Sequence, residues 1–139
     1  MMQEPKNYGE TMKSKGGLSR LINALRYTWD GLKAAAEHEH AFKQELIIVV
    51  PLSLAAWFVP VSAMERALLF SVLQLILIVE LINSAIEANT DHISLARHPL
   101  AKRAKDMGSA AVFLTIVIAV ATWGSVLWHN DLIQKIFSR

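Results

Sequence analysis

The sequence predicts an all-α membrane protein, in which an N-terminal amphipathic surface helix precedes three transmembrane helices. The composition, the spacing of the first apolar residues and three long apolar segments predict this class. Hydrophobic residues make up 53% of the 139 residues and charged residues 19%, whereas soluble domains carry about 25% charge. A chain of this length forms one domain, which we expect over residues 18–130, between polar tails at 1–17 and 131–139.

The composition also excludes several classes of function. The net charge of +2 is too small to indicate a nucleic-acid partner, and the chain has no basic stripe interleaved with aromatic residues. Because the chain contains no cysteine, disulfides, thiol redox chemistry and thiolate metal sites are excluded. The first 17 residues are polar and carry no apolar core of a signal peptide, so we expect a disordered tail there.

The first predicted element is an amphipathic helix that begins near residue 18. Its apolar residues recur at helical spacing and form one stripe: Leu18, Leu21, Ile22, Leu25, Trp29 and Leu32. Because long apolar segments follow, we expect this helix to lie on a membrane surface. Four nearby cations would favour anionic headgroups: Lys13, Lys15, Arg20 and Arg26.

Three apolar segments predict membrane spans at about 42–59, 67–90 and 107–128. The first contains Pro51, which is expected to kink it, and the second includes a polar extension beyond Ile82. The third has no charged residue and is the clearest span. Pro60 and Ser62 mark a tight turn between the first two.

The distribution of lysine and arginine predicts the orientation. Residues 1–45 contain seven of the 14, and the predicted loop 91–106 contains four. The positive-inside rule places both segments in the cytoplasm. We therefore expect a multi-pass membrane protein with a cytoplasmic N-terminus. Small residues recur in the third segment and would let helices approach closely, so we also expect a homo-oligomer.

Three carboxylates share one face at the cytoplasmic end of the second segment. At about 100° per residue, Glu87 and Asp91 each project within about 20° of Glu80, and Asn83 borders this face. Acids stacked in this way repel one another unless a positive charge lies among them. Magnesium prefers carboxylate and phosphate oxygens, so the face is typical of a site for Mg²⁺ and a phosphate compound.

Glu80 is the candidate general base, because it lies at the membrane border, where an acid is costly and where lipid hydroxyls lie. The alternative is a structural glutamate paired with a cation of a neighbouring helix. Lys105 could contact phosphate or act only as a positive-inside anchor. Glu39 and Glu45, taken alone, are more simply explained as solvated charges. Phosphate-binding glycine motifs such as GxxxxGK[ST] and GxGxxG are absent from the sequence.

Two stretches, ELINSAIEANTD and AKRAKDMGSAAV, resemble the signature stretches of the small prokaryotic diacylglycerol kinases. The resemblance extends from about Gly17 to Trp128 and includes GLSRLINALRYTWDGLKAA and EHAFKQE. It departs from the family pattern at Asn89 and Thr90, which stand where apolar residues are usual, and in the loop 91–106.

This resemblance implies a lipid kinase that transfers the γ-phosphate of MgATP to diacylglycerol and gives phosphatidic acid. It implies a homotrimer with active sites between subunits. Glu80 matches the catalytic base, Asn83 lies beside the chemistry, and Glu39 and Glu87 match the metal-binding glutamates. The implied nucleotide contacts are Arg20, Tyr27, Glu39, Glu87, Asp91, Lys105 and Asp106. The implied lipid contacts are Arg20, Trp29, Arg66, Glu80, Ser109 and Trp123.

Two alternatives stay open on the sequence. An undecaprenol kinase would share the core motifs and act on a prenol. A non-enzymatic relay or assembly subunit of a membrane complex would use the same acids without consuming ATP. The full surface helix and the stretch KDMGSAAV favour the diacylglycerol type by resemblance alone.

Overall fold

The computed structural model describes residues 17–93 and 98–131, and these residues form four α-helices. The helices are α2 (Gly17–His38), α3 (His40–Ala56), α4 (Ala63–Ile93) and α5 (Pro99–His129). The predicted tails fall almost entirely outside the described residues. The predicted all-α class is confirmed over the part of the chain that the structure describes.

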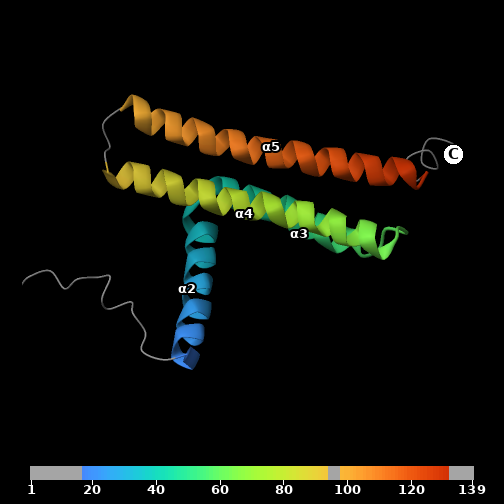
Figure 1. Cartoon of the computed structure of the whole chain (residues 1–139), viewed down its shortest axis with the longest axis horizontal. Helices are drawn as coiled ribbons and strands as arrows, with labels where there is room; N and C mark the ends of the chain where they lie inside the picture. The colour runs from blue at the N-terminus through green and yellow to red at the C-terminus, as the bar shows by residue number, and fades with distance from the viewer. Residues whose placement is uncertain (1–16, 94–97, 132–139) are drawn as a thin grey trace, which may run out of the picture.

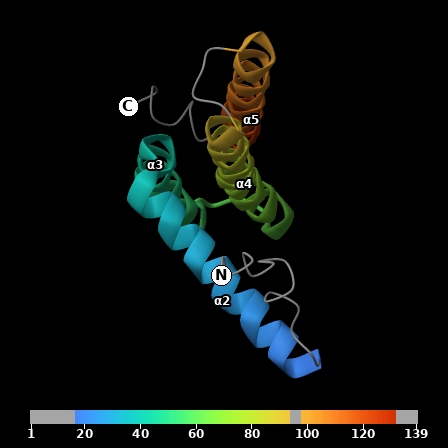
Figure 2. The same cartoon turned by 90° about the vertical axis from the view of Figure 1, so that its left-hand side faces the viewer.

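Helices α3, α4 and α5 lie side by side as a bundle, and α4 packs against both of the others (Figures 1 and 2). The chain reverses direction between α3 and α4 and again between α4 and α5. Helix α2 projects from one end of this bundle at a steep angle (Figure 1). We call this the elbow end, because α2 meets α3 there; α4 ends and α5 begins at the same end.

The core is a stripe along α4. Leu69, Val72, Leu73 and Ile76 recur at three- and four-residue intervals and are buried, as one face of an α-helix requires. They pack with four small or branched residues of the flanking helices, namely Val49, Ala56, Ala119 and Val126. The small residues Ala56 and Ala119 let the three helices approach closely.

Two helices are long and apolar enough to cross a membrane: Ala63–His92, with a mean hydropathy of 2.1, and Pro99–His129, with 2.2. In the most apolar part of α5, only 17% of the residues are buried within the chain. A core helix of a soluble protein would be mostly buried, so this outward-facing surface favours a membrane protein. Two of the three predicted spans therefore coincide with membrane-capable helices.

Helix α3 coincides with the first predicted span, but it is shorter than predicted. It continues through Pro51 and ends at Ala56, and Trp57–Val59 form a turn before Pro60. The residue before a proline is disfavoured in the α conformation, which explains why the helix does not reach Val59. Its 17 residues extend over about 26 Å, slightly less than the hydrocarbon core of a bilayer.

Most of the described part of the predicted loop 91–106 is helical. Helix α4 continues to Ile93, and α5 begins at Pro99. The backbone N–H of Leu100 donates to Nδ1 of His98 at 3.2 Å, and Pro99 occupies the first helical position. A side-chain acceptor at the N-cap and a proline directly after it favour a helix start. Lys102, Arg103 and Lys105 therefore belong to a helix.

The predicted amphipathic helix is present as α2. Its apolar stripe faces outward: Leu18, Leu21, Ile22, Leu25, Trp29 and Leu32 are between 40% and 74% exposed. Within α2 only Ala35 is buried. A helix with an exposed apolar face suits the surface of a membrane.

At the end of the bundle opposite the elbow, a capping box forms at the start of α4. The backbone N–H of Ser62 donates to the Glu65 carboxylate at 2.9 Å, and the Glu65 N–H donates to Ser62 Oγ at 3.2 Å. The amide of Asn130, at the end of α5, donates to the same carboxylate at 3.0 Å. Ser62 thus caps α4, and Glu65 joins it to α5.

Within the apolar part of the bundle, Gln74 donates from α4 to Ser53 Oγ of α3 at 3.1 Å. We predict that Gln74→Leu lowers the free energy of unfolding by about 0.6 kcal/mol, the average for such bonds between membrane helices. Unfolding in mixed micelles with a denaturing detergent measures this change. Ser71→Ala is the control, because the Ser71 hydroxyl bonds only within α4, to the Ala67 carbonyl. Equal losses in both variants would contradict the interhelical role.

Candidate active site

A cavity of about 440 Å³ opens at the elbow end of the bundle, and we call it the acidic cavity. Its lining comes from all four helices and the residue between α2 and α3: His38, Glu39, His40, Ala41, Glu45, Glu80, Asn83, Ser84, Glu87, Ser109 and Val112. Four of these residues are carboxylates. Among the described residues, the lining contains neither lysine nor arginine.

The acidic face of α4 continues the core stripe of the same helix. Glu80, Asn83 and Glu87 follow Ile76 at intervals of four, three and four residues, so the packing that buries the core also directs them inward. Glu80 is 3% exposed and Asn83 is 7% exposed. Nδ2 of Asn83 donates to Glu87 Oε1 at 3.3 Å. The amide therefore orients the carboxylate one turn further along.

Gly108 lets α5 approach this face closely. A Cβ built at Gly108 would lie 2.1 Å from Oδ1 of Asn83, closer than atoms can approach. Asn83 Oδ1 is buried, and no hydrogen-bond partner for it lies among the described residues. The sequence reasoning counted Gly108 only as one of several small residues, because its contact is visible only once α4 and α5 are placed together.

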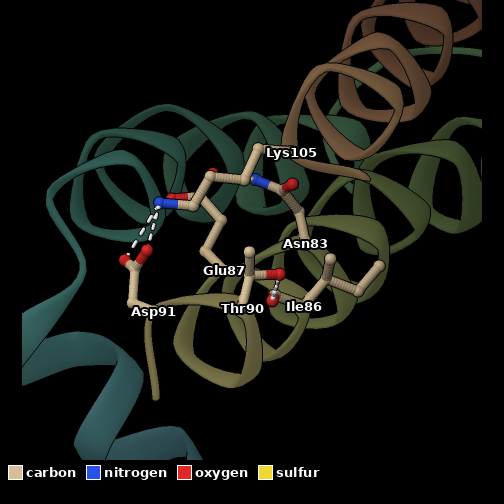
Figure 3. A network of polar contacts seen from close by, with 6 residues as sticks. All are labelled: Asn83, Ile86, Glu87, Thr90, Asp91 and Lys105. Atoms are coloured by element: carbon tan, nitrogen blue, oxygen red, sulfur yellow. Dashed lines mark hydrogen bonds and ion pairs between the residues drawn. The ribbon is translucent and has the colours of Figure 1, made fainter. Parts of the chain in front are cut away.

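Asp91 and Lys105 lie one turn beyond the acidic cavity and bind each other. Figure 3 shows Lys105 reaching from α5 past Asn83 and Glu87 to Asp91. Its ammonium lies 2.8 Å and 2.9 Å from the two Asp91 carboxylate oxygens. This hydrogen bond raises the pKa of the Lys105 ammonium, which precedes the apolar part of α5. The cation nearest to the acidic face is thus already paired with Asp91.

Glu39 reaches the acidic cavity because the chain turns sharply between α2 and α3. It is the single residue between the two helices, with an extended backbone at φ −97° and ψ 113°. Its N–H donates to Ala35 of α2, and its carbonyl accepts from Lys43 of α3. This elbow brings Glu39 to the same cavity as Glu80 and Glu87.

Glu45 is a candidate that the sequence reasoning missed. It was interpreted as a solvated charge, yet its Oε2 atom is buried and has no partner among the described residues. Glu45 lines the acidic cavity and also an apolar groove of about 420 Å³. The groove runs along α3, α4 and α5 to Trp123 and Gly124. One feature of the sequence could have indicated that Glu45 is a site residue. It lies six residues after Glu39, near the start of an apolar helix.

The remaining predicted site residues lie in different places. Ser109 lines the acidic cavity, whereas Asp106 is exposed and pairs with Lys102 on α5. Tyr27 lines a separate hollow between α2 and α4 that also touches Glu39 and Ser84. Trp123 lines the apolar groove, and its indole N–H donates to the Leu69 carbonyl at 3.3 Å.

Three further predicted residues, like Tyr27, Asp91, Lys105, Asp106 and Trp123, do not line the acidic cavity within one chain. Arg20 and Trp29 are exposed on α2. Arg66 lies at the far end, where its Nη2 donates to the Val59 carbonyl at 3.3 Å. A single copy of the chain therefore assembles the acids but not the whole predicted site.

The residues of the acidic cavity fit a magnesium ion that is shared with a phosphate compound. No group of three metal-binding side chains lies close enough to hold an ion alone within residues 17–93 and 98–131. Magnesium is usually bound by one or two carboxylates, substrate phosphates and water. Buried carboxylate and amide oxygens without partners, at Glu45 and Asn83, match that donor chemistry.

Comparison with known proteins agrees with these observations. A family model described as prokaryotic diacylglycerol kinase matches residues 26–127. A diacylglycerol kinase of Pseudomonas aeruginosa is 49% identical over 115 residues, covering 83% of this chain and 94% of that protein. That of Escherichia coli K12 is 48% identical over 114 residues, covering 82% and 93%. That of Haemophilus influenzae is 39% identical over 112 residues, covering 81% and 95%.

The bundle places a polar cavity and an apolar groove side by side, an arrangement that suits a lipid-modifying membrane enzyme. The chain belongs to the prokaryotic diacylglycerol kinase family, because the family model and these relatives cover most of its length. The resemblance stated from the two signature stretches is thereby confirmed.

We predict that Gly108→Ala lowers the free energy of unfolding by about 1–3 kcal/mol, because the added methyl group forces α4 and α5 apart at Asn83. Gly124→Ala is the matched control on the same helix, since nothing lies within 4 Å of a Cβ there. Unfolding in mixed micelles compares the two variants. Equal stability of the two variants would show that the Asn83 side chain can move away from the added methyl group with no loss of unfolding free energy.

Proposed function

We propose that this chain phosphorylates diacylglycerol, transferring the γ-phosphoryl group of ATP to the lipid hydroxyl to give phosphatidic acid and ADP. Membership of the family supports the reaction. The observation that carries the proposal is the buried Glu80, which lies in a cavity of acids. That cavity shares Glu45 with an apolar groove. A polar donor in the cavity and an apolar acceptor in the groove can therefore meet where the two join at Glu45, and Glu80 lines the cavity side of that junction.

Glu80 is the proposed general base. It takes the proton of the lipid hydroxyl while that oxygen bonds to the γ-phosphorus and the bond to the ADP oxygen breaks. Asn83 is proposed to act beside it, since its amide already orients Glu87. Glu39 and Glu87 are proposed to hold Mg²⁺. When bound, magnesium would neutralise charge on the phosphates.

The nucleotide is proposed to lie at the elbow end, beyond the acidic cavity. Asp91 and Lys105 line that approach, and Lys105 can contact phosphate as a point charge if Asp91 shares it. Asp106 lies one residue further along α5. Arg20 and Tyr27 of α2 complete the proposed set by resemblance to the family.

The lipid is proposed to lie along the apolar groove with its hydroxyl towards Glu80. The groove runs from Glu45 to Trp123, and its walls are apolar side chains apart from Glu45. The remaining proposed lipid contacts come from the resemblance: Arg20, Trp29, Arg66 and Ser109.

We further propose three spans (α3, α4 and α5) in the bacterial inner membrane, a cytoplasmic elbow end and a homotrimer. The lysine and arginine distribution supports the orientation. The exposed apolar surface of α5 and the separation of Arg20 and Trp29 from the acidic cavity support a site shared between copies.

The experiment that tests the proposal is phosphate transfer from labelled ATP by purified protein in detergent micelles with magnesium. Diacylglycerol and undecaprenol are offered side by side. Label in phosphatidic acid supports the proposal, whereas label only in the prenol product would make this chain an undecaprenol kinase. Label in neither, from folded protein, would contradict a kinase and favour a relay or assembly role.

We predict that Glu80→Gln abolishes phosphate transfer and leaves the folded protein intact, because the amide keeps the shape of the side chain but cannot accept the hydroxyl proton. Turnover is measured with the same assay, and folding by circular dichroism and gel filtration in detergent. Turnover near the parent level would contradict the assignment of Glu80 as the general base.

We predict that Glu87→Gln raises the magnesium concentration needed for half-maximal activity by about tenfold or more, since a charged metal ligand becomes a neutral one. Chelation of magnesium should abolish the activity of the parent, and added magnesium should restore it. Glu37→Gln is the control, because Glu37 is an exposed carboxylate of α2 outside the cavity lining. A normal magnesium requirement in Glu87→Gln would contradict the metal role.

A further inference from the structure

The angle between α2 and α3 depends on a short elbow. Glu39 is the only residue between the two helices, and its backbone is hydrogen-bonded to both of them. Apart from Ala35, no residue of α2 is buried, so packing restrains this helix weakly. An interaction that holds the angle between α2 and α3 therefore also holds the direction of the Glu39 side chain.

Lys43 contacts the other side of this elbow. Its side chain extends back from the first turn of α3, and Nζ donates to the Glu37 carbonyl of α2 at 2.8 Å. That carbonyl belongs to the last turn of α2, where carbonyls have no N–H partner within the helix. The last turn of α2 contains no lysine or arginine of its own. Lys43 thus supplies a cation at the negative end of the α2 dipole.

Lys43 is positioned for this contact rather than for an ion pair. Among the described residues, no carboxylate lies within 4 Å of its ammonium, whereas four other lysine and arginine side chains have such partners. Lys43 is partly exposed, and its contact with the Glu37 carbonyl lies at the surface. It spans the elbow that carries Glu39 to the acidic cavity, and it does not line that cavity itself.

We propose that Lys43 is a positioning residue, which locks the α2–α3 elbow through the Glu37 carbonyl and so holds Glu39 opposite Glu87 for metal and nucleotide. This inference rests on the proposed function. Lys43 acts through the backbone and touches neither the metal nor the reacting atoms. Arginine at this position can also donate to the carbonyl, whereas methionine keeps the length of the side chain without the donor.

The test compares Lys43→Met and Lys43→Arg with Lys33→Met as the matched control. Lys33 also contacts Glu37, but through the side-chain carboxylate at 3.7 Å within α2. Two measurements use the full protein in micelles. Hydrogen exchange of the backbone amides near residues 35–42 reports the elbow. Binding of Mn²⁺ with a non-hydrolysable ATP analogue, followed by the loss of the free-ion paramagnetic resonance signal, reports Glu39.

In Lys43→Met we expect faster exchange at the elbow and Mn²⁺ binding weaker by about three- to tenfold, which lies within the range for the loss of a typical hydrogen bond. Lys43→Arg and Lys33→Met should resemble the parent in both measurements. Faster exchange with unchanged Mn²⁺ binding would leave Lys43 purely structural and overturn the proposal. Weaker binding with unchanged exchange would make Lys43 a direct ligand contact and also overturn it.

Failure of the proposed function gives a different result. A parent protein that neither binds Mn²⁺ with nucleotide nor transfers phosphate overturns the kinase assignment itself. A parent that does both, beside a Lys43→Met variant that matches it in both measurements, overturns only the role of Lys43.

Discussion

The constraint on which the site depends is the grouping of four carboxylates around one cavity at the end of a membrane bundle. Glu39, Glu45, Glu80 and Glu87 line it, and the described part of its lining contains neither lysine nor arginine. Like charges in such a setting repel, and burial strengthens the repulsion. The arrangement therefore needs packing to hold it, and its charge must be neutralised by protons or by a bound cation. A divalent metal with a nucleotide is the ligand that the proposed function supplies.

Helix α4 provides that packing along a single face. The residues that fill the core, from Leu69 to Ile76, continue without a change of period into Glu80, Asn83 and Glu87. Ala119 and Gly108 of α5 are small where α4 comes near, which keeps the two helices close along both the apolar and the acidic parts. The close approach of α4 and α5 therefore stabilises the core near Ala119 and positions the acidic face near Gly108.

Periodicity and hydropathy predicted much of this structure. The stripe of α2, the apolar parts of α4 and α5, and the common face of Glu80, Asn83 and Glu87 all follow from spacing within one segment. Hydropathy could not show that α5 begins well before its apolar part, because the charged turns near Lys105 are helical without being apolar. The end of α3 at Ala56 could not be predicted from hydropathy, because the apolar residues continue to Val59.

Contacts between segments could not be predicted in this way. Glu39 was assigned by resemblance alone, since only the elbow carries it to α4, and Glu45 was missed because nothing in its own segment shows which helix it faces. The same holds for the contact of Gly108 with Asn83 and of Lys43 with Glu37. Each depends on how two helices meet, which a single stretch of sequence does not specify.

The most direct test of this account is the unfolding free energy of the magnesium-free protein, compared between the parent and Glu80→Gln in mixed micelles. If the four carboxylates repel one another without a resident cation, removing one charge raises the stability of the metal-free protein. A clear loss of stability would contradict the account. It would mean that Glu80 is a structural partner of a cation, supplied within the assembled protein by another copy of the chain.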